Sequence, residues 1–336
     1  MISLWDTTGS AVVKALAAER RSAGGVASGL ALTLVAIVDE RQMHAAESAV
    51  TIATSAHPCR LLLVVRYDVT DQRSRLDAEV IVGGRLGPGE AVAMRMRGRL
   101  ALHAESVIMP LLAPDVPVVT WWQGAQPDRI AYDPLGVVAE RRITDCAKAD
   151  DPITQLAVRA DDYAPGDTDL SWTRITPWRT LVAGTLDTVR DEIRVTGTTI
   201  AAPPRDPSAV LLGGWLSARL GLTPQMTEGP GDRISAVRVD LSDGAAIEIT
   251  RDNGNARLCR TGLPERTLPL VVRPVGEELA EELRRLDADQ PYAAALAAAT
   301  GRSGLDERQP TRVHVWHDPA LAERPDRADA ETVAAG

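Results

Sequence analysis

The side chains best suited to binding lie in the segment 164–179, which carries Trp172, Trp178, Arg174 and Arg179. The whole sequence has seven Trp, four Tyr and no Phe, so this short segment uses a scarce kind of side chain twice. Trp and Arg are the residue types that most often anchor contacts between proteins. Two interpretations follow: a helix cap with two Trp packed in the core, or a site for a partner or an anion.

An anion site here would use the start of a helix. Pro177 suits a first helical turn, so the sequence predicts a helix onset at this position. Free backbone N–H groups at such an onset favour negative charge. Arg174 and Arg179 are five residues apart and do not share one helical face, but they can converge on an anion from a turn and a helix start. We expect a partly exposed pocket or rim in which this segment lies beside Trp121 and Trp122.

Two further arginines, Arg60 and Arg141, are candidates for binding a partner or an anion. Arg60 opens a predicted strand, and Arg141 follows the strand that ends in Trp121 and Trp122. Ligands of open α/β sheets gather at the carboxyl ends of strands, and Arg makes two-pronged contacts to phosphates and carboxylates. Because neighbouring strand residues point to opposite faces, we expect at most one of the two Trp to be fully in the core.

Cys59 is the candidate redox residue. His57 and Arg60 flank it, and positive neighbours lower the pKa of a thiol and make it reactive. The alternative is a small buried residue at the start of a strand. The three cysteines, at positions 59, 146 and 259, are far apart and odd in number, which favours reduced thiols over a disulfide framework.

Signatures of catalysis and of cofactor binding are weak or absent. The Gly-rich segment 83–89 follows a strand, but it lacks both the Gly-Lys-Ser/Thr ending of a phosphate loop and the spacing of a dinucleotide fingerprint, which favours a plain turn. The sequence has no Gly-x-Ser-x-Gly nucleophile elbow. His314 and His317 have a spacing that metals use, without Cys or acidic residues clustered nearby. We therefore expect no enzyme activity, no metal and no cofactor.

Composition narrows the class of protein further. The net charge of −9 argues against nonspecific nucleic-acid binding through a basic surface. No run approaches the roughly 18 apolar residues that a membrane span needs, and the first residues lack the pattern of a signal peptide. We expect a cytoplasmic protein that is not bound to a membrane.

The first part of the chain alternates helical and strand patterns, which predicts an α/β domain with a mixed sheet over residues 1–190. The expected strands are 30–38, 60–65, 76–82, 90–96 and 118–122, and the expected helices are 8–24, 41–55, 101–111 and one within 133–147. At 336 residues, the chain is long enough for a second domain.

The later part has closely spaced turns, which predicts an α+β domain with antiparallel hairpins over residues 205–305. The expected strands are 235–241, 246–250, 256–261 and 268–272, and the expected helices are 208–220, 277–286 and 293–299. We expect a linker near residues 201–204 and a flexible tail over 316–336, which is rich in Pro, Asp, Arg and Ala.

Four local patterns, at residues 54–60, 111–122, 141–145 and 165–179, are more specific together than any one alone. In this order and spacing, the chain resembles the glucose-6-phosphate dehydrogenase assembly protein family, OpcA, in its actinobacterial form. The resemblance runs from about residue 5 to 300 and is strongest over 54–180.

The resemblance implies a non-catalytic cytosolic activator that helps glucose-6-phosphate dehydrogenase to assemble or stay active, and so supports NADPH production in the oxidative pentose phosphate pathway. The family offers no catalytic or binding residues to place on this chain. In related photosynthetic bacteria it is tied to redox control through Cys. One alternative stays open: a regulatory protein or enzyme that binds a sugar phosphate or a nucleotide through Arg60, Arg141, Arg174 and Arg179.

Overall fold

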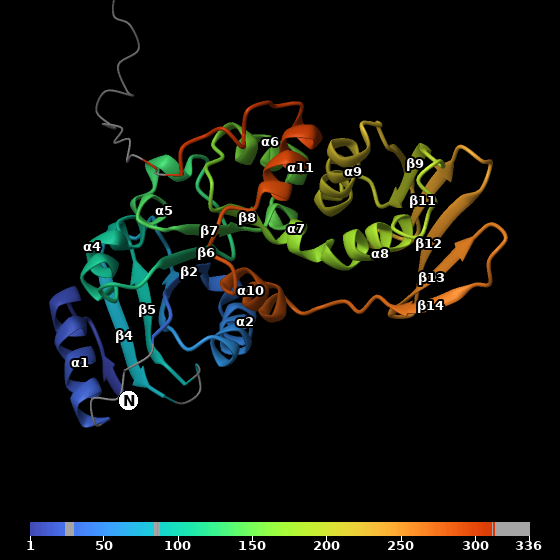
Figure 1. Ribbon diagram of the computed structural model, residues 1–336. Helices are drawn as coiled ribbons and strands as arrows, with labels where there is room; N and C mark the ends of the chain where they lie inside the picture. The colour runs from blue at the N-terminus through green and yellow to red at the C-terminus, as the bar shows by residue number, and fades with distance from the viewer. Residues whose placement is uncertain (24–29, 84–85, 87, 311, 313–336) are drawn as a thin grey trace, which may run out of the picture.

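The computed structural model describes residues 1–23, 30–83, 86, 88–310 and 312. Four expectations fall wholly or partly outside these residues: the end of the helix at 8–24, the Gly-rich turn at 83–89, the pair His314 and His317, and the tail at 316–336. Within the described residues, two sheets with helices around and between them form the fold (Figure 1).

The first sheet has eight strands in a mixed arrangement, as the sequence predicted. Its order is β1 (Ile2–Leu4), β4 (Arg75–Val82), β5 (Glu90–Arg97), β3 (Arg60–Arg66), β2 (Thr33–Asp39), β6 (Val118–Trp122), β7 (Arg141–Thr144) and β8 (Asp167–Asp169). The strands β5, β3, β2, β6, β7 and β8 pair in parallel with one another, whereas β4 pairs antiparallel with both β5 and the edge strand β1. The apolar runs in β2 and β3 are buried along nearly their whole length, as expected for strands covered on both faces.

Helices cover both faces of this sheet and make two separate cores. On one face, α1 (Gly9–Ser22), α3 (Arg99–Leu102), α4 (Glu105–Ile108) and α5 (Pro134–Val137) pack with the strands. On the other face lie α2 (Met43–Ala56) and α10 (Val275–Leu283). The single helix expected over 101–111 is instead two short helices that end in a 3-10 turn, η2 (Met109–Leu111), because the helical hydrogen bonding stops at His103.

The second sheet has six strands and is largely antiparallel, which confirms the predicted second fold type. Its order is β10 (Gln225–Glu228), β9 (Val195–Ala202), β11 (Ala236–Leu241), β12 (Ala246–Asp252), β13 (Asn255–Arg260) and β14 (Arg266–Pro269). Only β10 and β9 pair in parallel. Alternate residues such as Val237 and Val239 are buried against α8 (Thr176–Leu186) and α9 (Pro207–Leu220).

The connection between the sheets differs from the expected linker. Ala201 and Ala202 are the last residues of β9 and pair with β10 and β11, so residues 201–204 do not lie between the sheets. The chain instead crosses from β8 through α7 (Leu170–Arg174) and α8, whereas α6 (Pro152–Asp161) connects β7 to β8, both in the first sheet. A division into two folding domains remains a proposal.

The two last helices also leave the second sheet, with which the sequence grouped them. After β14, the chain runs back along residues 270–274 to α10, which packs beside α2 (Figure 1). Helix α11 (Gln290–Thr300) then packs against α9 and α6. The short 3-10 turns are η1 (Glu40–Gln42), η3 (Ile130–Tyr132) and η4 (Cys146–Lys148).

Candidate functional site

The four Trp singled out in the sequence are buried and lie in three different cores. Trp121 and Trp122 are 0% exposed, and Trp172 and Trp178 are 1% exposed. Trp121 packs with α2 and α10, and Trp122 packs on the opposite face of the sheet. The expected partly exposed rim is therefore wrong. The alternation of side chains does send Trp121 and Trp122 to opposite faces, but helices cover both faces.

Arg60 and Arg141 are buried in internal ion pairs. The Arg60 guanidinium lies 2.7 Å from Glu90 Oε2 and donates a hydrogen bond to the Leu111 carbonyl oxygen at 2.9 Å. Arg141 forms an ion pair with Glu282 of α10 and donates to the Asp287 carbonyl oxygen at 3.0 Å. Burial of a charge is tolerated when a partner and hydrogen bonds compensate for lost water, as they do here.

Arg174 lies between two carboxylates. Its two terminal nitrogens donate to both oxygens of Asp145 at 2.6 and 2.7 Å, and its Nη2 lies 3.0 Å from Glu278 Oε2. Burial by itself would lower the pKa of Arg174, but hydrogen bonds and charge attraction from these carboxylates raise it overall. This guanidinium is already neutralised by internal partners.

Arg179 makes a different contact, with an aromatic ring. Its guanidinium carbon lies 3.5 Å from the centroid of the Trp172 ring, and its Nη2 donates to Thr176 Oγ1 at 3.0 Å. Burial lowers the pKa of Arg179 to about 10. A cation over the face of an indole is attracted by the ring's electron density, which supports packing of the segment.

The surroundings of Cys59 favour the second interpretation, a small buried residue at the start of a strand, over an activated thiol. Cys59 is 1% exposed, and burial raises its pKa to about 12. Cys146 is also buried with a raised pKa, chiefly through burial, and all three cysteines are free thiols. The apolar surroundings at the start of β3 outweigh the charges that are adjacent in sequence, because Arg60 points to Glu90.

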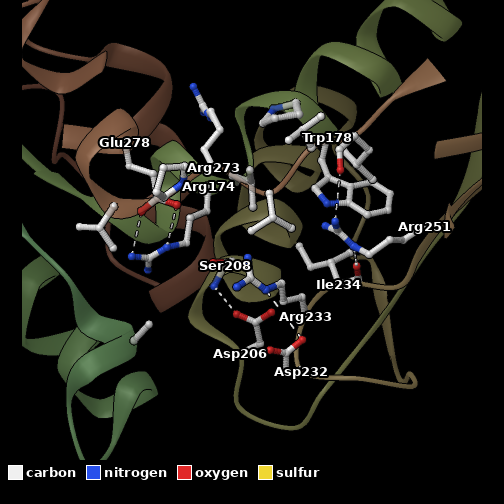
Figure 2. A pocket seen from close by; sticks show the side chains of 18 of the residues that line it. Arg174, Trp178, Asp206, Ser208, Asp232, Arg233, Ile234, Arg251, Arg273 and Glu278 are labelled. Carbon is white, nitrogen blue, oxygen red and sulfur yellow. Dashed lines mark hydrogen bonds and ion pairs between the residues drawn. The ribbon is translucent and has the colours of Figure 1, made fainter. Parts of the chain in front are cut away.

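A cavity of about 750 Å³ lies where the second sheet meets α7, α8, α9 and the returning segment 270–274 (Figure 2). Of the four arginines that the sequence offered as anion ligands, Arg174 alone lines it. The lining residues are Ala147, Lys148, Arg174, Ile175, Pro177, Trp178, Asp206, Ser208, Asp232, Arg233, Ile234, Arg251, Leu270, Val271, Val272, Arg273, Pro274, Val275 and Glu278. Its size is within the range of ordinary small-molecule sites.

The lining of this cavity carries more positive than negative charge. Its cations are Lys148, Arg174, Arg233, Arg251 and Arg273, and its acids are Asp206, Asp232 and Glu278. Sequence reasoning missed Arg233 and Arg251. The two are 18 residues apart along the chain, and only the antiparallel pairing of β11 with β12 places the loop that holds Arg233 beside Arg251.

Arg251 is held in a fixed position at the cavity wall. Its Nε donates to the Ile234 carbonyl oxygen at 3.0 Å, and its guanidinium carbon lies 5.5 Å from the Trp178 ring centroid. Burial, followed by the repulsive charge of Arg233, lowers the pKa of Arg251. In Figure 2, Arg251 lies beside Trp178, across the cavity from the pair formed by Arg174 and Glu278. The arrangement can hold an anion, because two cations that repel each other face one space.

Fold and cavity together define an α/β protein with an appended antiparallel sheet and a charged cavity at their junction. Two family models match this chain, and both are described by the name glucose-6-phosphate dehydrogenase subunit. Residues 50–161 match the N-terminal domain of that family, and residues 165–296 match its C-terminal domain. The chain belongs to the glucose-6-phosphate dehydrogenase assembly protein family, OpcA. No individual curated protein matches it.

The two matched regions meet between α6 and β8, which is earlier than the junction expected near residues 201–204. Within the described part of the chain, no helix has the length and apolar character to cross a bilayer. The same residues include no group of three His, Cys, Asp or Glu side chains placed to hold a metal.

Proposed function

We propose that this protein is a non-catalytic assembly factor that binds glucose-6-phosphate dehydrogenase and raises its activity. It thereby supports NADPH production by the oxidative pentose phosphate pathway in the cytoplasm. The observation that carries the proposal is the pair of family matches, both named for the dehydrogenase and together reaching from residue 50 to residue 296.

The Arg and Trp residues that stood out in the sequence are packed inside the protein, which supports a structural role for them. Arg60, Arg141 and Arg174 each have a buried carboxylate partner, and Trp172 and Trp178 fill the core beneath the second sheet. We therefore propose that the segment 164–179 supports the surface that meets the dehydrogenase, through the positions of α7 and α8, without contacting the partner through its Trp side chains. The same internal pairing removes support for a sugar-phosphate site built on these arginines.

The proposal is tested by mixing the purified chain with the dehydrogenase of its own organism. We expect a complex of larger mass by size-exclusion chromatography with light scattering, and a faster rise in NADPH absorbance than with the dehydrogenase alone. The chain by itself should form no NADPH from glucose 6-phosphate and NADP. Serum albumin at equal mass controls for nonspecific protection of a dilute enzyme. An unchanged mass and an unchanged rate would overturn the proposal.

A further inference from the structure

The cavity between the sheets retains positive charge after its internal ion pairs are taken into account. Arg174 is neutralised by Asp145 and Glu278, and Arg273 forms an ion pair with Glu281. For Lys148 and Arg251, the described residues include no carboxylate within ion-pair distance. The cavity therefore contains cations that lack a counter-charge from the protein.

The acids of the lining do little to offset these cations. Asp206 caps α9 by accepting a hydrogen bond from the Ser208 N–H at 2.8 Å, so its carboxylate is engaged at the start of that helix. The side chain of Asp232 is 90% exposed and lies 3.8 Å from Arg233 Nε, a long and solvated contact. Exposed pairs of this kind are weak, because water and salt screen the attraction between the two charges. Arg233 is thus only weakly compensated.

Arg251 has the geometry of a preorganised anion ligand. The Ile234 and Leu270 carbonyl oxygens accept from its Nε and Nη1, at 3.0 and 3.5 Å, and the Trp178 ring lies beside it. These contacts fix the guanidinium plane without neutralising its charge. The remaining nitrogen, Nη2, donates to no described protein group, so it is available to a ligand in the cavity. A guanidinium fixed in advance loses little side-chain entropy on binding.

We propose that this cavity binds a small phosphorylated molecule, whose phosphate lies between Arg251 and Arg233 with Lys148 as a further cation. Arg forms two-pronged, charge-assisted hydrogen bonds to phosphate oxygens. A group of several cations suits a doubly charged phosphate ligand better than a ligand with one singly charged carboxylate. A volume of about 750 Å³ leaves room for the rest of a metabolite beside the phosphate. Lys148 comes from η4 beside the first sheet and Arg251 from the second, so the ligand joins both parts of the fold. This inference does not rest on the assembly role.

Isothermal titration calorimetry of the full chain in phosphate-free, low-salt buffer tests the proposal. The probes are inorganic pyrophosphate and ribose 5-phosphate, with neutral ribose as the uncharged control. We expect one saturable site for each phosphorylated probe and none for ribose. Arg251→Gln and Arg233→Gln should each weaken binding by at least about tenfold, because each removes a charged hydrogen-bond donor.

The matched control is Arg238→Gln, which removes an equal charge from β11 at an exposed position outside the cavity. It should leave the affinity within about twofold of wild type, since an exposed distant charge is screened by solvent and salt. Thermal melts establish that each variant folds. If Arg251→Gln is unfolded, the exposed Arg233→Gln decides the matter. The proposal is overturned if neither phosphorylated probe binds at millimolar concentration, or if the folded cavity variants bind like wild type.

Discussion

Arg174 at the end of α7 and Glu278 in α10 form an ion pair, with 3.0 Å between Nη2 and Oε2, across 104 residues of sequence. Asp145, just after β7, takes the other side of the same guanidinium. The pair therefore joins the point where the chain leaves the first sheet to the helix by which it returns. This ion pair fixes the position of α10 and, because both residues line the charged cavity, it also fixes one wall of that cavity.

Removal of this cation should strongly destabilise the fold. The side chains of Asp145 and Glu278 are 1% and 4% exposed, so Arg174→Ala leaves two carboxylates buried without their partner. We expect a loss of about 3–5 kcal/mol in the free energy of unfolding, measured by urea denaturation at neutral pH. The control is Arg238→Ala, whose pair with Asp240 is exposed and should contribute less than about 1 kcal/mol. Equal losses for the two variants would contradict this account.

Substitution of a helical glycine by Ala should lower the stability of the fold at one position and raise it at another. A Cβ on Gly214 of α9 would meet the Ala295 carbonyl oxygen and lie 2.8 Å from Ala299 Cβ in α11. Gly214→Ala should therefore cost about 1–3 kcal/mol through overpacking. A Cβ on Gly184 of α8 meets nothing within 4 Å, so Gly184→Ala should stabilise by about 0.5–1 kcal/mol through helix propensity. Thermal melts of both variants measure the two shifts, and a Gly214→Ala protein as stable as wild type or more stable would show that α9 and α11 do not pack this closely.

The buried thiol of Cys59 predicts a loss of stability at alkaline pH. Its pKa is raised from its ordinary value of 9.0 to about 12 in the folded state. Above pH 9 the unfolded chain releases this proton while the folded chain keeps it, so the free energy of unfolding falls as pH rises. Between pH 9 and 12, the fall from this group approaches about 1.4 kcal/mol per pH unit.

Urea denaturation of wild type and Cys59→Ala at several pH values from about 9 to about 10.5 isolates this contribution, because the other groups titrate in both proteins. We expect the free energy of unfolding to fall more steeply with pH in wild type. Parallel pH profiles would mean that Cys59 ionises freely in the folded protein, and would return it to consideration as a redox residue.

The helices and strands predicted most accurately are those in which the pattern of apolar residues follows directly from which residues are buried. The apolar runs at 30–38, 60–65 and 118–122 are strands β2, β3 and β6, because a strand covered on both faces needs apolar residues throughout. The helix predicted at 208–220 is α9, with Asp206 as its cap and Gly221 at its end. These signals are local, so no knowledge of distant partners was needed.

Strands whose buried side chains are charged have no apolar run by which the sequence could reveal them. The helix expected within 133–147 is the short α5, but no strand was predicted for β7, which follows it and whose Arg141 and Arg142 are buried against Glu282 and Asp167. Strand β8 has no apolar residue at all. Each carboxylate partner lies at least 25 residues further along the chain, so these positions look solvent-exposed until the tertiary structure pairs them.

The candidate site was the least predictable feature, for the same reason. A Trp-Arg segment fits a partner contact and a core equally well, and the decision depends on what covers it. Helices on both faces of the first sheet buried Trp121 and Trp122. The cations that face a cavity, Arg233 and Arg251, lie in an exposed loop and in a hairpin strand whose spacing matches no known motif.

Trp172 should act on the dehydrogenase through folding alone. Its ring lies under Arg179 and beside Tyr292, with 5.8 Å between ring centroids, and its Nε1 donates to Asp289 Oδ2 at 2.8 Å. Trp172→Ala should cost about 3–5 kcal/mol of folding free energy, whereas Trp172→Phe keeps most of the packing and should cost less. Activation of NADPH formation, measured at a temperature where circular dichroism shows every variant to be folded, should equal that of wild type. A folded Trp172→Phe protein that no longer activates the dehydrogenase would show that this segment takes part in partner binding after all.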